Sequence, residues 1–241
     1  MDTLPFPFPL PPDEILRRRA QILTMLVAAD DGFCSLPVRS VAPSTLRNML
    51  RLYDDLFLCG MLRSAYGHLD ITLSSRLTSA AGKFIYTRSA ATRTQQAEIR
   101  MSSDFLFRLT DGPFSLNGLT VATAQEAFLI VFEHELCHAA ETALFGSTGH
   151  SRRFRTLSNG LFGHTDIRHS LPTRRHNAAL SGFAVGMRAS FPYEGKELTG
   201  TVTYIGKTAT VMVRSLRGPY KDLLGRRYTK YRVPLEILKK T

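Results

Sequence analysis

Two histidines and a glutamate that could carry out metal-dependent chemistry stand together at residues 134–138, where the sequence reads HELCH. Residues four apart on an α-helix lie on the same face, one turn from each other, so His134 and His138 could hold one metal ion together. Glu135 stands beside the first histidine, where its carboxylate could take a proton from a water molecule at that ion. The spacing therefore predicts a catalytic zinc site with Glu135 as the general base.

The number of protein ligands decides whether such a zinc site is catalytic or structural. Three protein ligands leave one position for water, whereas a fourth ligand closes the site. His150 is the best-placed third ligand, because the sequence GSTG lets the chain turn back and a short helix is expected to follow. Three further residues stay open as ligands that would saturate the metal in a structural site: His164, His169 and Asp166.

Two other residues near the histidine pair are expected to have different roles. Glu141 lies three residues past His138 on the same helix, and we expect it behind the ligands or in solvent rather than on the metal. Cys137 points away from the face that carries the histidines, and we expect it to be a small buried apolar side chain.

The histidine pair lies in a segment that predicts a helix, TAQEAFLIVFEHELCHAAETALF. Thr123 and Glu126 at its start form the pattern of a capping box, in which each side chain accepts the other's free backbone N–H. A second short helix is expected from Ser151 to Asn159, ended by Gly160. These two helices would position the ligands.

The chain before these helices predicts two more helices and three strands. The first helix is expected from about Asp13 to Ala29, after an extended proline-rich start, LPFPFPLPP. The second lies in APSTLRNMLRLYDDLFLCG, with Ser44 as its cap and Gly60 as its end. Short alternating segments then predict an antiparallel sheet: HLDITLS, GKFIYTR and AEIRMSS.

The chain after the histidine cluster changes character. The stretch HSLPTRRHNAALSG is expected to be a linker, and beyond Phe183 the pattern is that of short β-strands. Alternation on both sides of IGKT predicts a hairpin. Several short strands within about 60 residues favour a small closed barrel.

The charge of the chain is concentrated in this C-terminal part. The whole chain has 31 basic and 20 acidic residues, a net charge of +11, and the segment 183–241 holds twelve basic and four acidic residues. Such an excess favours a polyanionic partner, nucleic acid above all. Four tyrosines lie among these cations, as stacking on bases would require: Tyr204, Tyr220, Tyr228 and Tyr231.

Beyond these patterns, HELCHAA…GHSRRF resembles the SprT-like zinc metalloprotease family, whose pattern is H-E-x-x-H-A followed by G-H-x-x-x-F. The resemblance runs roughly from Ser44 to Leu171 and includes YDDLFLCGMLRSAYGHLDITLSSRLTSAAGKFIYTR and EIRMSSDFL. It implies a zincin-like α+β fold, zinc ligands at His134, His138 and His150, and Glu135 as general base. Family members that cleave proteins crosslinked to DNA combine the protease with DNA-binding elements.

The C-terminal part departs from the family. Many members carry a cysteine-rich zinc ribbon after the protease core, but this chain has three scattered cysteines. Its tail resembles a small SH3-like or KOW-like barrel, a fold that binds RNA or protein as well as DNA. We therefore expect an N-terminal extension with a helix (1–43), a metalloprotease domain (44–175), a linker (176–182) and a basic barrel (183–241).

The expected function is that of a zinc metalloendopeptidase acting on nucleic-acid-associated proteins such as DNA–protein crosslinks. One alternative is a nucleic-acid or ribosome-associated binding protein with a structural zinc site, and another is a peptidase without a polyanionic partner. The odd number of cysteines, the absence of a CxxC pair and the lack of a long apolar run favour a cytoplasmic, nucleoid- or nucleus-associated protein without a membrane segment.

Overall fold

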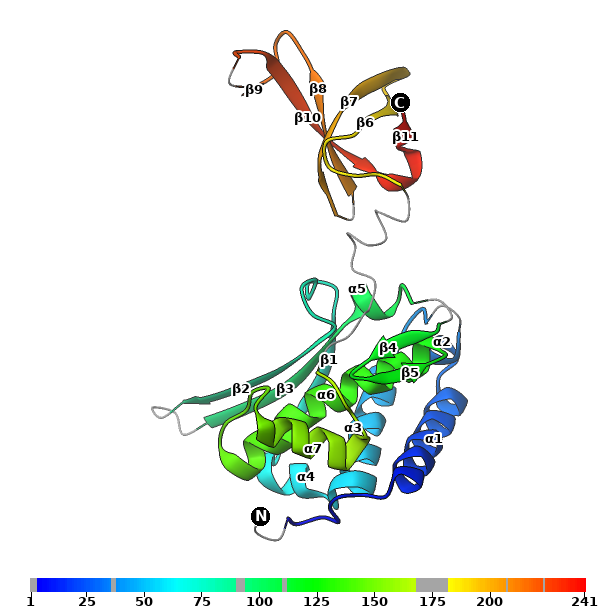
Figure 1. Cartoon of the computed structure of the whole chain (residues 1–241), viewed down its shortest axis with the longest axis vertical. Helices are drawn as coiled ribbons and strands as arrows, with labels where there is room; N and C mark the ends of the chain where they lie inside the picture. Colours follow the sequence, from blue (N-terminus) through cyan, green and yellow to red (C-terminus); the bar gives the residue numbers. More distant parts are fainter. Residues whose placement is uncertain are drawn as a thin grey trace. The chain divides into compact units, whose positions relative to one another are not determined.

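The computed structural model of the chain describes residues 4–35, 38–89, 94–109, 112–167, 182–206, 208–222 and 224–241. The chain divides into two compact units, Met1–Leu171 and Pro172–Thr241 (Figure 1). Helices and strands occur together, so the protein is of the α+β class. Of the linker expected at 176–182, all but Gly182 lies outside the described residues.

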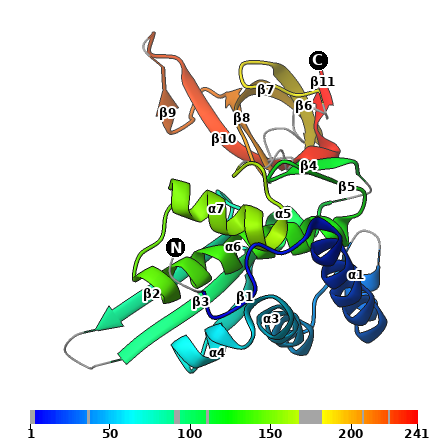
Figure 2. The same ribbon diagram turned by 60° about the horizontal axis from the view of Figure 1, so that its bottom comes forward.

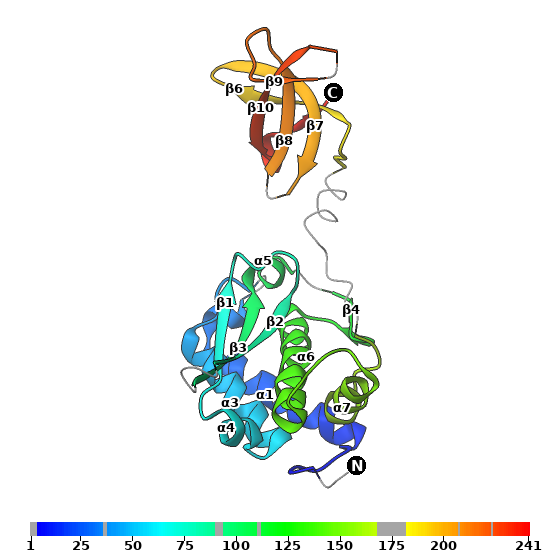
Figure 3. The ribbon, with the colours of Figure 1, turned by 90° about the vertical axis from the view of Figure 1, so that its left-hand side faces the viewer.

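The N-terminal unit is built around one long helix, α6 (Ala124–Phe145), which lies against strands β2 and β3 on one side and against α1, α4 and α7 on others (Figures 1 and 3). Side chains all around α6 are buried, as is usual for a helix enclosed in a core. The other helices of this unit are α1 (Pro12–Ala29), α2 (Asp31–Cys34), α3 (Pro43–Leu58), α4 (Met61–Tyr66), α5 (Ser103–Leu106) and α7 (Arg152–Phe162).

The sheet beside α6 contains β1 (Asp70–Ser74), β2 (Gly82–Ser89) and β3 (Thr94–Ser102), in the order β1-β3-β2. The prediction of an antiparallel sheet is only half right: β2 and β3 are antiparallel, but β1 pairs with β3 in parallel. After β1 the chain continues into the outer strand β2, and it then returns as β3, which lies between β1 and β2. Strand β3 therefore runs in the same direction as β1. A separate hairpin joins β4 (Phe114–Leu116) to β5 (Leu119–Val121).

The capping box at the start of α6 is confirmed: the Thr123 hydroxyl accepts the Glu126 N–H, and the Glu126 carboxylate accepts the Thr123 N–H. The expected cap of α3 is wrong, because Ser44 lies inside the helix. The N-cap residue is Ala42, which has no side-chain cap; the Asp30 carboxylate instead ties down the start of α3 by accepting the Ala42 N–H at 2.8 Å and the Thr45 hydroxyl at 2.7 Å.

Of the two expected helix ends, one agrees with the structure and one is wrong. Helix α3 ends at Leu58, and Cys59 (φ 53°) and the expected stop Gly60 (φ 79°) follow it in left-handed conformations, with Gly60 as the N-cap of α4. Helix α7 continues through Gly160 and ends at Gly163, where φ is 71°. Gly160 lies inside the helix, and the Phe8 ring rests on it so closely that a Cβ atom there would lie 2.3 Å from the ring.

The proline-rich start belongs to the same core as α6. Phe6 and Leu10 are buried among its residues. The Leu10 N–H donates to the Gly160 carbonyl at 2.9 Å, so the N-terminal segment runs beside α7 (Figure 2). This segment therefore supports the helix that follows the third candidate ligand.

The C-terminal unit is a six-stranded sheet in the order β11-β6-β7-β8-β10-β9, with every pair antiparallel. Its strands are β6 (Arg188–Tyr193), β7 (Lys196–Ile205), β8 (Thr208–Arg214), β9 (Tyr220–Lys221), β10 (Arg227–Pro234) and β11 (Lys239–Lys240), with a 3-10 turn at Leu235–Ile237. The hairpin predicted around IGKT is confirmed by the β7–β8 pairing. The sheet curves around a small apolar core that includes Phe191, Val202, Val211 and Val233 (Figure 3).

Candidate metal centre

Three histidines converge at the end of α6. His134 and His138 lie one turn apart on that helix, and Gly146 ends it in a left-handed conformation (φ 74°) that lets the chain return. His150 thereby reaches the pair: one ligand atom from each ring lies within 4.8 Å of the others. The Nε2 atoms of His134 and His150 are 3.0 Å apart. The structure thus brings together the three residues expected to be ligands.

Phe154 fixes the three rings from behind. Its ring centroid lies 5.1 Å from that of His134, 4.3 Å from that of His138 and 5.1 Å from that of His150. The Ser151 hydroxyl caps α7 by accepting the Phe154 N–H, so this aromatic side chain sits on a well-formed first turn. The packing limits ring rotation before any ion is bound.

A hydrogen-bonded chain orients the His138 ring. Its Nδ1 lies 2.7 Å from the Thr148 hydroxyl, which donates its single proton to Glu141 at 2.8 Å. The hydroxyl can only accept from His138, so Nδ1 carries the proton and Nε2 keeps its lone pair for a metal. Glu141 also accepts bonds from the Gly149 N–H and from Arg153, and it lies behind the ligands.

The pKa shifts of His138 and Glu141 suit metal binding. Burial and, to a lesser extent, the neighbouring His150 lower the pKa of His138 to about 4 although Glu141 opposes the shift, so the ring is neutral at pH 7. Burial alone would raise the pKa of Glu141, but hydrogen bonds from Thr148, Arg153 and Gly149 lower it below its ordinary value. Neutral imidazole is the form that binds metals.

The donor set fits a divalent ion such as zinc. In a tetrahedral zinc site with bonds of 2.0–2.1 Å, neighbouring nitrogens stand about 3.3 Å apart, close to the separation of His134 and His150. Imidazole also suits copper, iron and nickel. The group could therefore hold a metal ion, and its geometry does not by itself specify which one.

Glu135 enters the same cavity from the next position on α6. The cavity has a volume of about 380 Å³ and is lined by the three histidines, Glu135 and residues 80–84. One carboxylate oxygen of Glu135 accepts the Phe84 N–H at 2.8 Å. Burial raises the pKa of Glu135 to about 7, although this hydrogen bond opposes the rise. A carboxyl group with such a pKa can take up and release protons near neutral pH.

Strand β2 forms one wall of the cavity because it lies at the edge of the described sheet. The Phe84 N–H points to Glu135 rather than to β3. Gly82 leaves room for this carboxylate, because a Cβ atom there would lie 2.6 Å from the Glu135 Cγ. Sequence reasoning missed this contact, since Gly82 and Glu135 are far apart in the chain.

Two of the three further candidate ligands, His164 and Asp166, take other places in the structure. His164 is buried, and its Nε2 lies 3.0 Å from a carboxylate oxygen of Glu133, away from the three-histidine group. Asp166 accepts the N–H of its neighbour Ile167. Cys137 is buried with its sulfur 3.8 Å from the Phe154 carbonyl oxygen, in agreement with its expected apolar role. His169 lies outside the described residues.

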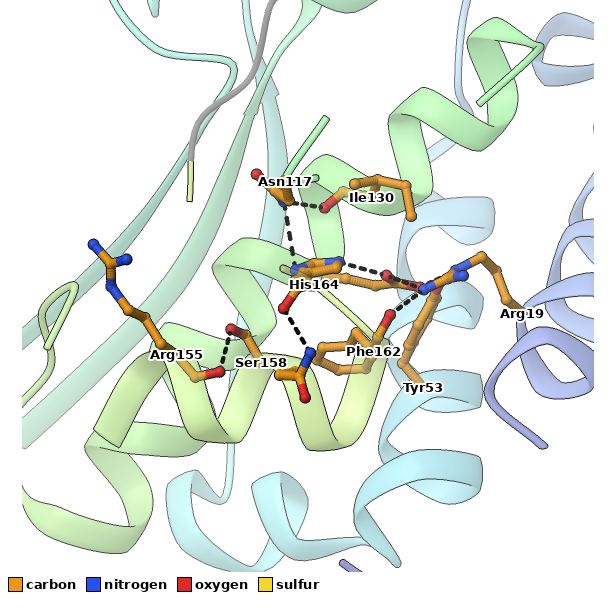
Figure 4. A network of polar contacts seen from close by, with 10 residues as sticks. Arg19, Tyr53, Asn117, Ile130, Arg155, Ser158, Phe162 and His164 are labelled. Atoms are coloured by element: carbon orange, nitrogen blue, oxygen red, sulfur yellow. Dashed lines mark hydrogen bonds and ion pairs between the residues drawn. The ribbon is translucent and has the colours of Figure 1, made fainter. Parts of the chain in front are cut away.

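A buried polar network around Glu133 of α6 was not predicted. Glu133 accepts two bonds from Arg19 at 2.7 and 2.8 Å, one from Tyr53 at 2.8 Å and one from His164 (Figure 4). Burial raises the pKa of Glu133, but Arg19 and His164 outweigh it and bring the pKa to about 2. Asn117 reaches the other ring nitrogen of His164 at 3.5 Å. The network ties α6 to α1, α3 and the chain after α7.

Comparison with known proteins does not identify the chemistry of this site. No protein-family model matches the chain, and no curated protein matches it significantly. Within the ranges that the structure describes, no helix combines the length and the apolar character needed to cross a lipid bilayer.

Proposed function

We propose that the N-terminal unit is a zinc-dependent metallopeptidase with a zincin-like fold, and that the C-terminal sheet is an SH3-like barrel. The observation that carries the proposal is the meeting of three imidazole side chains with the carboxylate of Glu135 in one cavity. In the described part of the chain, no fourth His, Cys, Asp or Glu joins this group. Three protein ligands are what a catalytic zinc site requires.

The roles of the residues follow from their positions. His134, His138 and His150 would hold the ion. Bound there, zinc would lower the pKa of a water molecule towards 7 and polarise the carbonyl of a peptide bond. Glu135 would accept the proton of the attacking water and return it to the leaving amine nitrogen. Its hydrogen bond to the Phe84 N–H keeps the carboxylate directed into the cavity.

The edge of β2 offers a place for the substrate backbone. Because the Phe84 N–H faces away from β3 to Glu135, the alternation of the ladder also turns the Phe84 carbonyl and the backbone groups of Gly82 and Tyr86 to the outer edge. A peptide in extended form would pair with this edge and pass the cavity. Recognition by backbone hydrogen bonds gives affinity without strong sequence preference.

The rival function is a nucleic-acid or ribosome-associated binding protein with a structural zinc. It requires a fourth protein ligand, and His164 and Asp166 do not supply one within the described ranges. It also gives no reason for a buried glutamate that points into the cavity. Both observations favour the peptidase.

Glu135→Gln in the zinc-loaded full chain tests the proposal. The variant should retain wild-type metal content and lose hydrolysis of an unfolded protein substrate, together with self-cleavage, by at least about 100-fold. Glu98→Gln removes a carboxylate from β3 outside the cavity and should leave activity unchanged, while His150→Ala should lose metal. A zinc-loaded wild type without hydrolysis, or a fully active Glu135→Gln variant, would overturn the assignment.

A further inference from the structure

Several side chains of the C-terminal sheet lie on the face that points away from its apolar core. Val211 and Val233 turn to the core, so the alternate residues of β8 and β10 turn outward. The strand pairing places Arg232 opposite Thr210 and Lys230 opposite Met212. Tyr204 of β7 and Tyr220 of β9 stand on the two sides of these pairs. We call these six residues the tyrosine–cation face: Tyr204, Thr210, Met212, Tyr220, Lys230 and Arg232.

The tyrosine–cation face is hollowed into a groove of about 690 Å³. Tyr204 is 63% exposed and Tyr220 is 46% exposed, high values for large aromatic side chains in a small unit. Three strand spacings of about 4.8 Å separate β7 from β9, so the two rings flank a floor about 14 Å wide. Gly206 allows the Tyr204 ring to lie against the hairpin, because a Cβ atom there would be 2.9 Å from it.

The cations of this face, Lys230 and Arg232, form no ion pair within the described ranges. The Lys230 ammonium lies 5.9 Å from the centroid of the Tyr220 ring. The acid nearest in the strand order, Asp222, is already held by Arg226 at 2.7 Å. Glu197 bonds to Ser190 on the far strand β6. The face therefore presents positive charge to solvent, in a segment whose net charge is +8 by its twelve basic and four acidic residues.

We propose that the tyrosine–cation face binds single-stranded nucleic acid. Unpaired bases would stack on Tyr204 and Tyr220, and the intervening phosphates would contact Lys230 and Arg232. Exposed rings that flank a cationic floor match the two parts of a polynucleotide strand, whereas a duplex hides its base faces within the stack. An acidic peptide would satisfy the cations but would leave the two rings without partners.

This binding would direct the peptidase, a consequence that rests on the proposed function of the N-terminal unit. A protein attached to the same strand would be held near the cavity at a high effective concentration. Substrates would then be proteins bound or crosslinked to nucleic acid. The binding itself does not depend on the metal site, so the two proposals fail separately.

Fluorescence anisotropy of the full chain with labelled dT20, rU20 and a 20-base-pair duplex tests the face. We expect tighter binding of one or both single strands than of the duplex, and the comparison of dT20 with rU20 shows whether DNA or RNA is preferred. Tyr204→Ala with Tyr220→Ala should weaken binding at least about 30-fold, since two stacked bases are lost. The corresponding Phe variants keep the rings and should stay within about threefold of wild type.

The cations are tested with a charge-matched control. The double variant Lys230→Met, Arg232→Met loses two phosphate contacts. A plot of the logarithm of the association constant against the logarithm of the salt concentration should therefore have a slope that is less negative by about 1.4. Lys196→Met with Lys239→Met removes the same charge outside the groove and should change the slope by less than half as much. Equal effects of the two pairs, unaltered binding by the double Ala variant, or equal affinity for the duplex would overturn the proposal.

Discussion

Gly82 of β2 and Glu135 of α6 leave no room for a side chain at position 82 in the candidate active site. A Cβ atom at position 82 would lie 2.6 Å from the Glu135 Cγ and 2.9 Å from its Oε1, whereas ordinary contacts begin at 3.4 Å. Gly82→Ala therefore requires the Glu135 side chain to move by about 0.8 Å. The move pulls the carboxylate away from the Phe84 N–H that directs it into the cavity.

A displacement of about 1 Å in a catalytic group costs roughly 100-fold in rate. We therefore expect Gly82→Ala to lower kcat/KM about 100-fold for an unfolded protein substrate. The three atoms nearest to the new methyl group all belong to Glu135 and not to a histidine, so the zinc content of the purified variant should equal that of wild type. A fluorescence assay of hydrolysis measures kcat/KM, and elemental analysis of the same samples measures the zinc content.

Gly149→Ala is the matched control, because a Cβ atom there meets nothing within 4 Å although Gly149 lines the same cavity. Its activity should stay within about threefold of wild type. A Gly82→Ala enzyme of full activity would refute the idea that this glycine seats the general base. A loss of activity that merely follows a loss of zinc would refute it as well.

Other predictions address the supports of the site. Thr148→Val breaks the bond that orients His138 and should weaken zinc binding about 10- to 100-fold in competition with a chelator, while Thr148→Ser should not. Glu133→Gln leaves the buried Arg19 without its charge partner and should lower the free energy of unfolding by about 3–5 kcal/mol in urea, and a change below 1 kcal/mol would contradict this. Asp30→Ala should cost about 1 kcal/mol at pH 7. Hydrogen bonds lower the pKa of Asp30 against its partial burial, so the contribution of its carboxylate is present above pH 3.8 and should fade as the pH falls further. An Asp30→Ala cost that persists at pH 2 would contradict this.

The sequence was most informative where one local rule decides the outcome. The capping pattern of Thr123 and Glu126 predicted the start of α6, and the four-residue spacing of His134 and His138 predicted that they share a face. Both rules act within one or two turns of helix, between residues that are neighbours in the sequence. His150 was predicted as a third ligand from the turn residues before it, and the structure brings it to the pair.

The sequence was least informative where distant segments meet. Gly160 looked like the end of a helix, but Phe8 rests on it, and the helix continues to Phe162. Asp30 holds the start of α3 from the end of another helix, which no local pattern near Ser44 indicates. The parallel pairing of β1 with β3 also depends on the path of the chain between strands, not on alternation within them.

The buried network shows the same limit. Glu133 stands next to the candidate ligand His134 in sequence but turns away from the histidines, towards Arg19 and Tyr53. His164 was considered as a ligand because of its residue type, yet its partner is this glutamate. Residue types alone could not separate a histidine that binds metal from one that completes a buried ion pair.

X-ray absorption at the zinc edge, on the loaded full chain, tests the central claim most directly. We predict that zinc is surrounded by three imidazole nitrogens at about 2.0–2.1 Å and by one further light atom that is not part of an imidazole. This set of neighbours should be unchanged in Glu135→Gln, whereas His150→Ala should lose the metal. A sulfur neighbour at about 2.3 Å or a fourth imidazole would show a closed, structural site and contradict the peptidase.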